Sequence, residues 1–170
     1  MNTRTLQLKM DYRQDQSTDI FGLLQRITGT GPVDVMNVRM MVEPQAAAAA
    51  ASNATDADLT NIREAHEVAM ASKEPASFEA QDAEFHKRIF SATRNELLTC
   101  LHDMLRVIRN QSSWVEIKRR SYSEERRLGY CADHDTIVKA LYARDAKAAE
   151  TAMRAHLMAV NRNLFGNEFA

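Results

Sequence analysis

The stretch that decides the fold is Ser77-Phe-Glu-Ala-Gln-Asp-Ala-Glu-Phe-His-Lys-Arg-Ile-Phe90. Its apolar residues recur at helical spacing, which predicts the inward face of a helix; they are Phe78, Phe85 and Ile89. Asp82 and His86 lie on the same face, four residues apart, so that one side chain stacks a turn above the other. A carboxylate and an imidazole that point into a core are costly unless they are paired, hydrogen-bonded or bound to something.

Two later stretches repeat this combination of apolar and titratable residues. His134 shares a helical face with Ile137, Val138 and Leu141, and His156 shares one with Ala149, Met153 and Val160. One aspartate and three histidines that converge inside a helical bundle are donors suited to zinc, nickel, manganese or iron(II). The alternative for each histidine is a hydrogen-bonded residue at the core or its edge. His66 and His102 favour that alternative, as boundary residues with acidic neighbours.

The composition is that of one helical domain without a strong charge. The chain has 170 residues, 45% hydrophobic and 26% charged, with only 5 Gly and 3 Pro, which favours helix throughout. A net charge of −1 gives no general attraction to nucleic acid or membrane. The fold class predicted is all-α, an antiparallel bundle of six or seven helices.

Cysteine usage and the N-terminus predict a cytoplasmic location. Cys100 and Cys131 stand in unrelated contexts without metal-ligand spacing, which is typical of a reduced compartment. The first ten residues lack the apolar core of a signal peptide, and no apolar run approaches the length of a membrane span.

Breaks in periodicity divide the chain. Residues 1–33 are interpreted as a leader or linker, with a short helix over Ile20–Ile27, and residues 34–165 as the folded domain. The helices expected in that domain span about 34–52, 55–72, 77–90, 97–108, 124–142 and 146–164. Asp34 is the predicted N-cap of the first, in which Pro44 predicts a kink or a break into two pieces. The helix limits within 111–127 are left open.

Two further residues are candidates for binding an anionic ligand. Arg39 has apolar neighbours; its guanidinium either forms a salt bridge to Glu43 one turn on or points into a pocket to hold a carboxylate. Arg106 is a candidate for a similar role. The basic stretch 106–127 lacks the interleaved aromatics of a single-strand binder and is interpreted as a solvated helix face.

The enzyme motifs that we considered are missing. Ferritin-like di-iron bundles need paired Glu-x-x-His motifs, and neither these nor His-Glu-x-x-His occur; Gly-rich phosphate loops and nucleophile elbows are also absent. A metal-dependent hydrolase or isomerase with Glu84 as base is the alternative, but Glu84 lies on the helix face opposite Asp82 and His86. A metal-free helical interaction module is the other alternative.

Several motifs together resemble one known family, the FadR C-terminal-like (FCD) effector domain of GntR-type bacterial transcription regulators. The resemblance covers about residues 35–160. It rests on Arg39-Met-Met-Val-Glu-Pro-Gln-Ala-Ala, Asp82-Ala-Glu-Phe-His86, Asn95-Glu-Leu-Leu98, Asp133-His134-Asp-Thr-Ile137, Ala140-Leu-Tyr-Ala-Arg-Asp145 and Met153-Arg-Ala-His-Leu157.

This resemblance implies a central metal and effector pocket inside the bundle. The metal ligands of metal-containing members match Asp82, His86, His134 and His156. The metal expected is a divalent ion, with zinc first and nickel, manganese or iron as alternatives. The effector expected is a small organic acid or sugar acid, with Arg39, Asn95 and Arg106 as the residues that bind it.

The resemblance also implies ligand sensing by a homodimer rather than catalysis. Members of the family carry an N-terminal winged helix-turn-helix that binds DNA, and 33 residues before the first bundle helix are too few for one. We therefore expect DNA contact only through a domain that this chain lacks, so that the chain is either an excised domain or a natural variant.

Overall fold

The computed structural model describes residues 19, 21–23, 25–27 and 29–166. The chain divides into two units, one before Pro32 and one from Pro32 onward. In the first unit, residues 21–23 and 25–27 are helical, in agreement with the short helix predicted there, and a turn follows in which the Gly29 N–H donates to Gln25 O. The rest of the predicted leader lies outside the described residues.

The second unit consists of seven helices, and none of its described residues forms a strand. The helices are α2 (Pro32–Asn53), α3 (Asp56–Ala71), α4 (Pro75–Ala92), α5 (Glu96–Arg109), α6 (Ser112–Ser121), α7 (Glu124–Tyr142) and α8 (Ala146–Phe165). The predicted all-α class is confirmed. The stretch left open becomes the separate helix α6 and the first turn of α7, whose N-cap Ser123 accepts a hydrogen bond from the Arg126 N–H.

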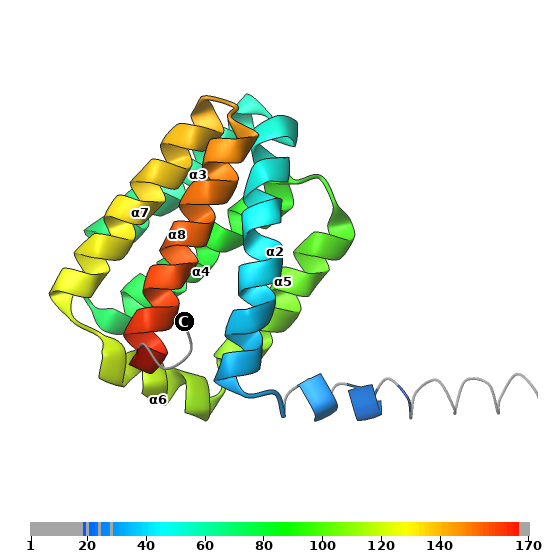
Figure 1. The fold of residues 1–170 in the computed structure, drawn as a ribbon, viewed down its shortest axis with the longest axis vertical. Coiled ribbons are helices and arrows are strands. Elements are labelled where there is room, and N and C mark those ends of the chain that lie inside the picture. The colour runs from blue at the N-terminus through cyan, green and yellow to red at the C-terminus, as the bar shows by residue number, and fades with distance from the viewer. Residues whose placement is uncertain (1–18, 20, 24, 28, 167–170) are drawn as a thin grey trace, which may run out of the picture. The chain divides into compact units, whose positions relative to one another are not determined.

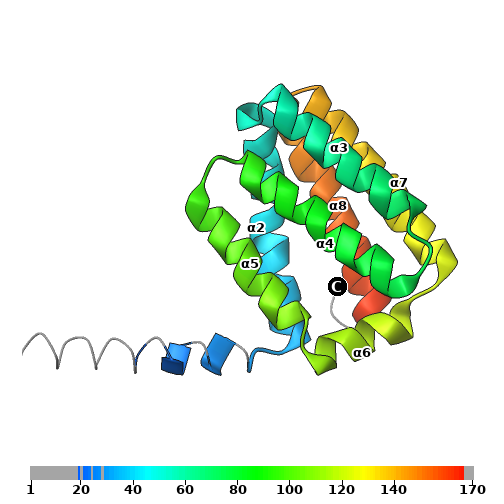
Figure 2. The ribbon, with the colours of Figure 1, turned by 180° about the vertical axis from the view of Figure 1, so that it is seen from behind.

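These helices form two layers. Helices α2, α8 and α7 form one layer, and α5, α4 and α3 form the other, while α6 crosses one end of the bundle (Figures 1 and 2). The apolar face predicted for α4 lies between the layers, because Phe78, Phe85 and Ile89 are at most 1% exposed. No described helix is long and apolar enough to cross a membrane.

Helix α2 departs from the prediction at its start and at its proline. It begins at Pro32 and not after Asp34, because proline is pre-set for the first helical turn, and Asp34 instead lies in that turn, where a carboxylate faces the positive end of the helix dipole. The helix is continuous through the buried Pro44, so of the two alternatives the break into two pieces is wrong, and the kink stays a prediction.

Two turns without glycine are tied to the corner between α2 and α3. Arg94, in the α4–α5 turn, and Arg144, in the α7–α8 turn, have φ values of 60° and 55°, in the left-handed region that costs a non-glycine residue free energy. The Arg94 guanidinium donates to Asp58, and that of Arg144 donates to Ala54 O and to Asp56 Oδ1. These contacts hold the two strained turns against one corner.

Candidate metal centre

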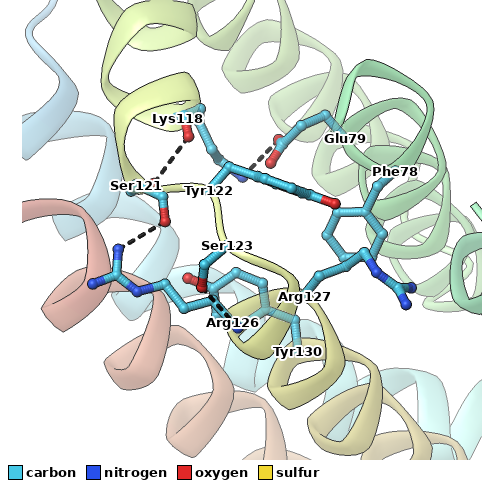
Figure 3. A pocket seen from close by; sticks show the side chains of 9 residues that line it. All are labelled: Phe78, Glu79, Lys118, Ser121, Tyr122, Ser123, Arg126, Arg127 and Tyr130. Atoms are coloured by element: carbon cyan, nitrogen blue, oxygen red, sulfur yellow. Dashed lines mark hydrogen bonds and ion pairs between the residues drawn. The ribbon is translucent and has the colours of Figure 1, made fainter. Parts of the chain in front are cut away.

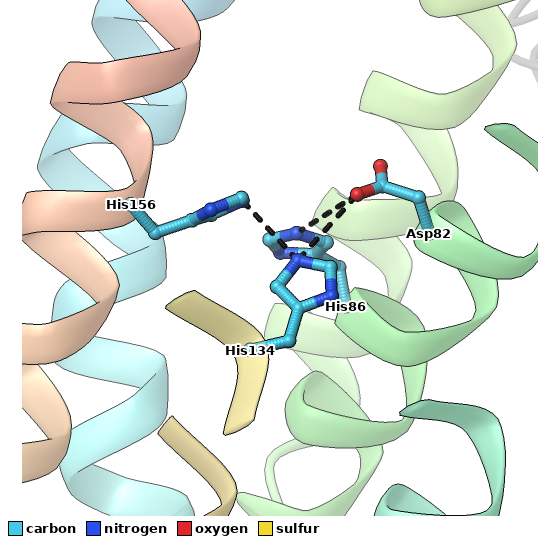
Figure 4. A group of neighbouring side chains, drawn as sticks. All are labelled: Asp82, His86, His134 and His156. Carbon is cyan, nitrogen blue, oxygen red and sulfur yellow. Dashed lines mark hydrogen bonds and ion pairs between the residues drawn. The ribbon is translucent and has the colours of Figure 1, made fainter. Parts of the chain in front are cut away.

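The four residues predicted as metal ligands come together in the core. Asp82 and His86 project from adjacent turns of α4, and His134 and His156 project from α7 and α8 (Figure 4). All four are buried, and one potential ligand atom from each lies within 4.8 Å of the others. The sequence pattern thus located a cluster that could hold a metal ion.

The imidazoles are packed by aromatic neighbours as well as by one another. The Phe85 ring stacks on His134, with centroids 4.2 Å apart and an interplanar angle of 22°. His134 and His156 meet edge to face, with centroids 4.6 Å apart. Because Phe85, His134 and His156 have no solvent exposure, these rings have little freedom to turn away from the cluster.

Carboxylates outside the cluster orient two of the histidines. His86 Nδ1 lies 2.7 Å from Glu43 Oε2, and His156 Nδ1 lies 3.3 Å from Asp133 Oδ2. A carboxylate beside Nδ1 favours the tautomer protonated there, which leaves a lone pair on Nε2.

The Nε2 atoms of the three histidines lie near Asp82 or near one another. Both ring nitrogens of His86 are buried without a hydrogen bond of good geometry among the described residues, so the 2.7 Å approach of Glu43 to Nδ1 acts on His86 through its charge. The Nε2 atoms of His134 and His156 lie 3.3 Å apart, and His134 Nε2 lies 3.5 Å from Asp82 Oδ1. Lone pairs this close are favourable only with a proton or a cation between them, so the donor set fits a borderline divalent ion.

Burial and nearby charges set the protonation states that a metal requires. Burial, and next the neighbouring His156, lower the pKa of His134 well below 6.5. Burial lowers the pKa of His156, against the hydrogen bond to Asp133. Burial alone would raise the pKa of Asp82, but Lys118 and then the nearby histidines and Arg109 hold it well below 3.8. Neutral imidazoles and an ionised carboxylate are the forms that bind metal.

Arg39 is engaged inside the core. Its Nε lies 2.6 Å from Glu43 Oε1, and both side chains are 1% exposed. Burial alone would raise the pKa of Glu43, but Arg39 and then His86 hold it well below 4.5. The salt bridge considered for Arg39 is therefore present, and it continues through Glu43 to His86.

The sequence analysis missed a second arginine at the cluster. Arg109 Nη2 lies 3.3 Å from Asp82 Oδ2, and the Arg109 side chain is 7% exposed. The Arg109 guanidinium also lies 5.7 Å from the centre of the Trp114 ring, within cation–π distance. Its position one turn after the buried Leu105 was the available signal.

A pocket that is open to solvent lies on the Arg109 side of the bundle. A cavity of about 700 Å³ lies between the first half of α4, the end of α5, and α6. Its wall contains Glu74, Pro75, Ala76, Glu79, Ala80, Ala83, Arg106, Arg109, Asn110, Trp114, Val115, Lys118, Arg119 and Tyr122. A volume of this size is within the range of small-molecule pockets.

A second hollow, of about 10 Å³, lies at the corner between α6 and α7. Figure 3 shows Lys118 paired with Glu79 and the Ser121 hydroxyl directed to the Lys118 carbonyl. Arg126 Nη1 donates to Ser121 O at 2.7 Å and to Asn163 O at 3.3 Å. The space has room for about one water, so this corner is a packed junction.

The remaining candidates have other surroundings. Asn95 is exposed at the N-cap of α5, where its side chain accepts hydrogen bonds from the Leu97 and Leu98 N–H groups. Arg106 is half exposed, 3.9 Å from Asp103, and lines the large cavity. Glu84, the alternative catalytic base, pairs with Arg88 at 2.9 Å.

His66 and His102 are more buried than boundary residues. Their exposed fractions are 6% and 2%. His66 lies 6.1 Å from His134, and His102 lies 4.9 Å from Phe90, measured between ring centroids. Neither belongs to the four-residue cluster, so their interpretation as non-ligands fits the geometry, while the boundary position expected for them is wrong.

The basic stretch of 106–127 divides between surface and core. Arg119 and Arg120 are exposed and both pair with Glu116. Arg127 is 4% exposed, donates to Met70 O and pairs with Glu124. The predicted solvated face therefore accounts for Arg119 and Arg120 but not for Lys118, Arg109 or Arg127.

Comparison with known proteins connects this geometry to one group. A family model described as the FCD domain matches residues 34–159. The Uxu operon transcriptional regulator of Escherichia coli is 33% identical over 138 residues, which cover 79% of this chain and 54% of that protein. The Exu regulon transcriptional regulator of Escherichia coli is 29% identical over 128 residues, which cover 75% of this chain and 49% of that protein. The chain spans about half the length of the curated relatives it matches.

Two solved structures share the fold. Streptococcus agalactiae GntR matches with a TM-score of 0.63 at 23% identity, over 82% of this chain and 60% of that one. E. coli McbR/YncC matches with a TM-score of 0.68 at 18% identity, over 78% of this chain and 63% of that one. At these identities the likeness concerns the arrangement of the helices.

Proposed function

Because this chain belongs to the FCD domain family, we propose that it is the ligand-sensing part of a GntR-type transcription regulator. In this proposal Asp82, His86, His134 and His156 bind one divalent metal ion, with zinc first. The domain also binds a small organic acid, and the combination controls DNA binding by a longer, homodimeric protein. The named relatives are transcriptional regulators, which favours sensing over catalysis.

The observation that carries the proposal is the convergence of four buried donors within 4.8 Å. A divalent ion bound there supplies positive charge and open coordination positions that attract a carboxylate. The chain's own residues prepare the site: Glu43 and Asp133 orient two of the histidines, and Arg109 holds Asp82. The effector-binding roles predicted for Arg39, Asn95 and Arg106 stay predictions, and of the three, the large cavity includes Arg106.

Ligand binding acts by favouring one arrangement of helices over another. The ligand shifts this equilibrium only by its difference in affinity for the two arrangements. Since the cluster joins α4, α7 and α8, a ligand that completes the metal's coordination bears on three helices at once. In a dimer, such a shift would change the spacing of two DNA-binding domains.

The experiment is elemental analysis of protein purified without chelator, together with melting curves with and without EDTA. We expect about one metal ion per chain and a lower melting temperature in EDTA. His134→Ala with His156→Ala should abolish metal content and the EDTA effect. His102→Gln is the matched control, a buried histidine outside the cluster. The proposal would be contradicted if wild-type protein contained no metal and its melting temperature changed with neither zinc nor EDTA.

A further inference from the structure

The four candidate metal ligands are closed off from solvent. His86, His134 and His156 have no exposed surface, and Asp82 is 4% exposed. A metal ion with its hydration water can therefore reach the cluster only when a part of the fold opens. Because Asp82 has the largest exposed fraction of the four, the opening is to be sought on its side of the cluster.

On that side, one residue of α5 and one of α6 stand between the large cavity and Asp82. Arg109 Nη2 lies 3.3 Å from Asp82 Oδ2, and the Arg109 guanidinium lies 5.7 Å from the centre of the Trp114 ring. Arg109 and Trp114 are 7% and 3% exposed, and both line the cavity. The Trp114 ring thus keeps Arg109 in place against Asp82.

Helix α6, which carries Trp114, has few attachments to the rest of the bundle. Trp114 is the one buried residue among its ten. Arg119 and Arg120 both pair with Glu116 of the same helix, so these charges do not fasten α6 to its neighbours. A short helix with one buried side chain belongs to the least stable parts of a fold.

Extended residues at both ends of α6 provide hinges. Gln111 precedes the helix with φ −78° and ψ 155°, and its side chain makes no capping hydrogen bond. Tyr122 and Ser123, both with extended backbone, separate α6 from α7. The contact from Arg126 to Ser121 O lies at this second hinge. Since rotations at a few residues of this kind move a helix as a unit, α6 can swing without unfolding its neighbours.

Two contacts tie α6 and the residue after it to the other side of the cavity. Lys118 Nζ lies 2.7 Å from Glu79 Oε2, one turn before Asp82 on α4 (Figure 3). The Tyr122 hydroxyl donates to Lys73 O at 2.9 Å. Glu79 is 31% exposed, and the Tyr122–Lys73 contact is exposed as well. Water can replace either partner at little cost in free energy, so each contact can open and close.

We propose that α6 is a hinged gate to the candidate metal centre and that its two contacts with Glu79 and Lys73 hold it closed. In the closed arrangement, Trp114 keeps Arg109 against Asp82. In the open arrangement, Trp114 moves away with α6, Arg109 is free to turn, and an ion passes from the cavity to the cluster. This inference rests on the proposed function and adds to it the route of the ion and the part that moves.

A gate acts on rates and leaves affinity alone. The closed arrangement covers the cluster with or without an ion, so weaker closing contacts should speed uptake and release of zinc by the same factor. A residue that acts on the site itself would instead change the affinity. This difference separates the two roles.

The test measures three quantities on the full chain: zinc release into excess EDTA, zinc affinity by competition with a chelator, and acrylamide quenching of Trp114, the single tryptophan. Tyr122→Phe removes one closing contact without a change in charge, and Glu79→Gln removes the other. We expect each variant to release zinc roughly two- to fivefold faster and to show stronger quenching of Trp114. Tyr122→Phe should keep the zinc affinity of wild type.

Two matched controls remove similar groups elsewhere. Glu150 pairs with Lys147 and Arg154 within α8, and Tyr142 on α7 lies beside the Arg63 guanidinium. Glu150→Gln and Tyr142→Phe should release zinc at the wild-type rate and leave the quenching of Trp114 unchanged.

The contrary outcomes are distinct. Wild-type release rates in both gate variants overturn the inference. Faster release with an equal loss of affinity in Tyr122→Phe overturns it as well, because the contact would then act on the site and not on access to it. The same acceleration in the controls would show general destabilisation and also overturns it. If the wild-type chain takes up no zinc, the proposed metal site is contradicted, and the quenching decides on the gate alone: stronger quenching in the two gate variants supports a movable α6, and unchanged quenching overturns it.

Discussion

Glu43 on α2 and His86 on α4 form a buried contact, with Oε2 2.7 Å from Nδ1 and at most 1% of either side chain exposed. The contact joins the two layers of helices directly beside the candidate metal centre. Because Arg39 holds the other Glu43 oxygen at 2.6 Å, the carboxylate has a fixed position from which to orient the imidazole.

Replacing Glu43 with Gln is therefore expected to weaken zinc binding roughly 10- to 100-fold. The variant also leaves the buried Arg39 without an anionic partner, so the free energy of unfolding should fall by about 3 to 5 kcal/mol. Competition with a chelator of known affinity measures the first effect, and urea denaturation in EDTA measures the second. Glu67→Gln, which changes an exposed glutamate paired to Arg63 at 3.8 Å, should change neither. Wild-type zinc affinity in Glu43→Gln would contradict the orienting role.

His102 should make the metal-free protein less stable in mild acid. Burial, followed by the neighbouring His86, lowers the pKa of His102 from 6.5 to about 4. Between these values the unfolded chain binds a proton that the folded chain does not, so this contribution is complete above pH 6.5 and is lost as the pH falls toward 4. The full effect is about 3 kcal/mol.

Denaturation in EDTA at several pH values between 7 and 4.5 tests this effect. His102→Gln, which does not titrate, should lose less stability than wild type over that range. Parallel curves for the two proteins would show that His102 is not the group responsible.

Filling the cavity should block acid binding without removing the metal site. Ala80 lies on the α4 wall of the cavity, and leucine there keeps helix propensity while occupying the space. Ala80→Leu is expected to weaken citrate or glucuronate binding by at least about tenfold, since a ligand and a side chain cannot share the volume. Zinc content and melting temperature should stay near wild type. Ala132→Leu, at an exposed position on α7, provides the control, and equal binding by both variants would place the acid elsewhere.

At Arg94, glycine should be better tolerated than alanine. Both substitutions remove the ion pair with Asp58, but only glycine relieves the φ of 60°. Arg94→Gly should therefore be more stable than Arg94→Ala by about 1 kcal/mol. Lys139 is exposed within α7, and there Lys139→Ala should be more stable than Lys139→Gly by about 1 kcal/mol. Urea denaturation of the four variants measures their free energies of unfolding. If the glycine variant were the more stable at both sites, or the alanine variant at both, the role of the φ angle at Arg94 would be contradicted.

The fold and the four-residue cluster were predictable because both depend on local periodicity. Asp82 and His86 share a face with apolar residues of their own helix, and His134 and His156 do the same, so a pattern within each helix was enough. The start of α2 was misplaced because Asp34 is a good N-cap residue, but Pro32 fits the first turn equally well.

The surroundings of the cluster depend on contacts between helices, which no local pattern contains. Glu43 was noticed only as a partner for Arg39, and its approach to His86 requires the packing of α2 on α4. Arg106 was chosen over Arg109, although Arg109 is the residue that faces Asp82. The local sequence around Asn95 was consistent with a helix N-cap, because asparagine is a preferred N-cap residue.

The tied turns of Arg94 and Arg144 give the two ends of the bundle different mechanical roles. Both arginines fasten their turns to the corner at Ala54–Asp58, whereas α6 and the start of α2 lie at the opposite end (Figures 1 and 2). The cavity also lies at that opposite end, beside α6. One end of the bundle is therefore braced by side chains from two turns, whereas the pocket and Pro32, where α2 begins, lie at the end without these ties.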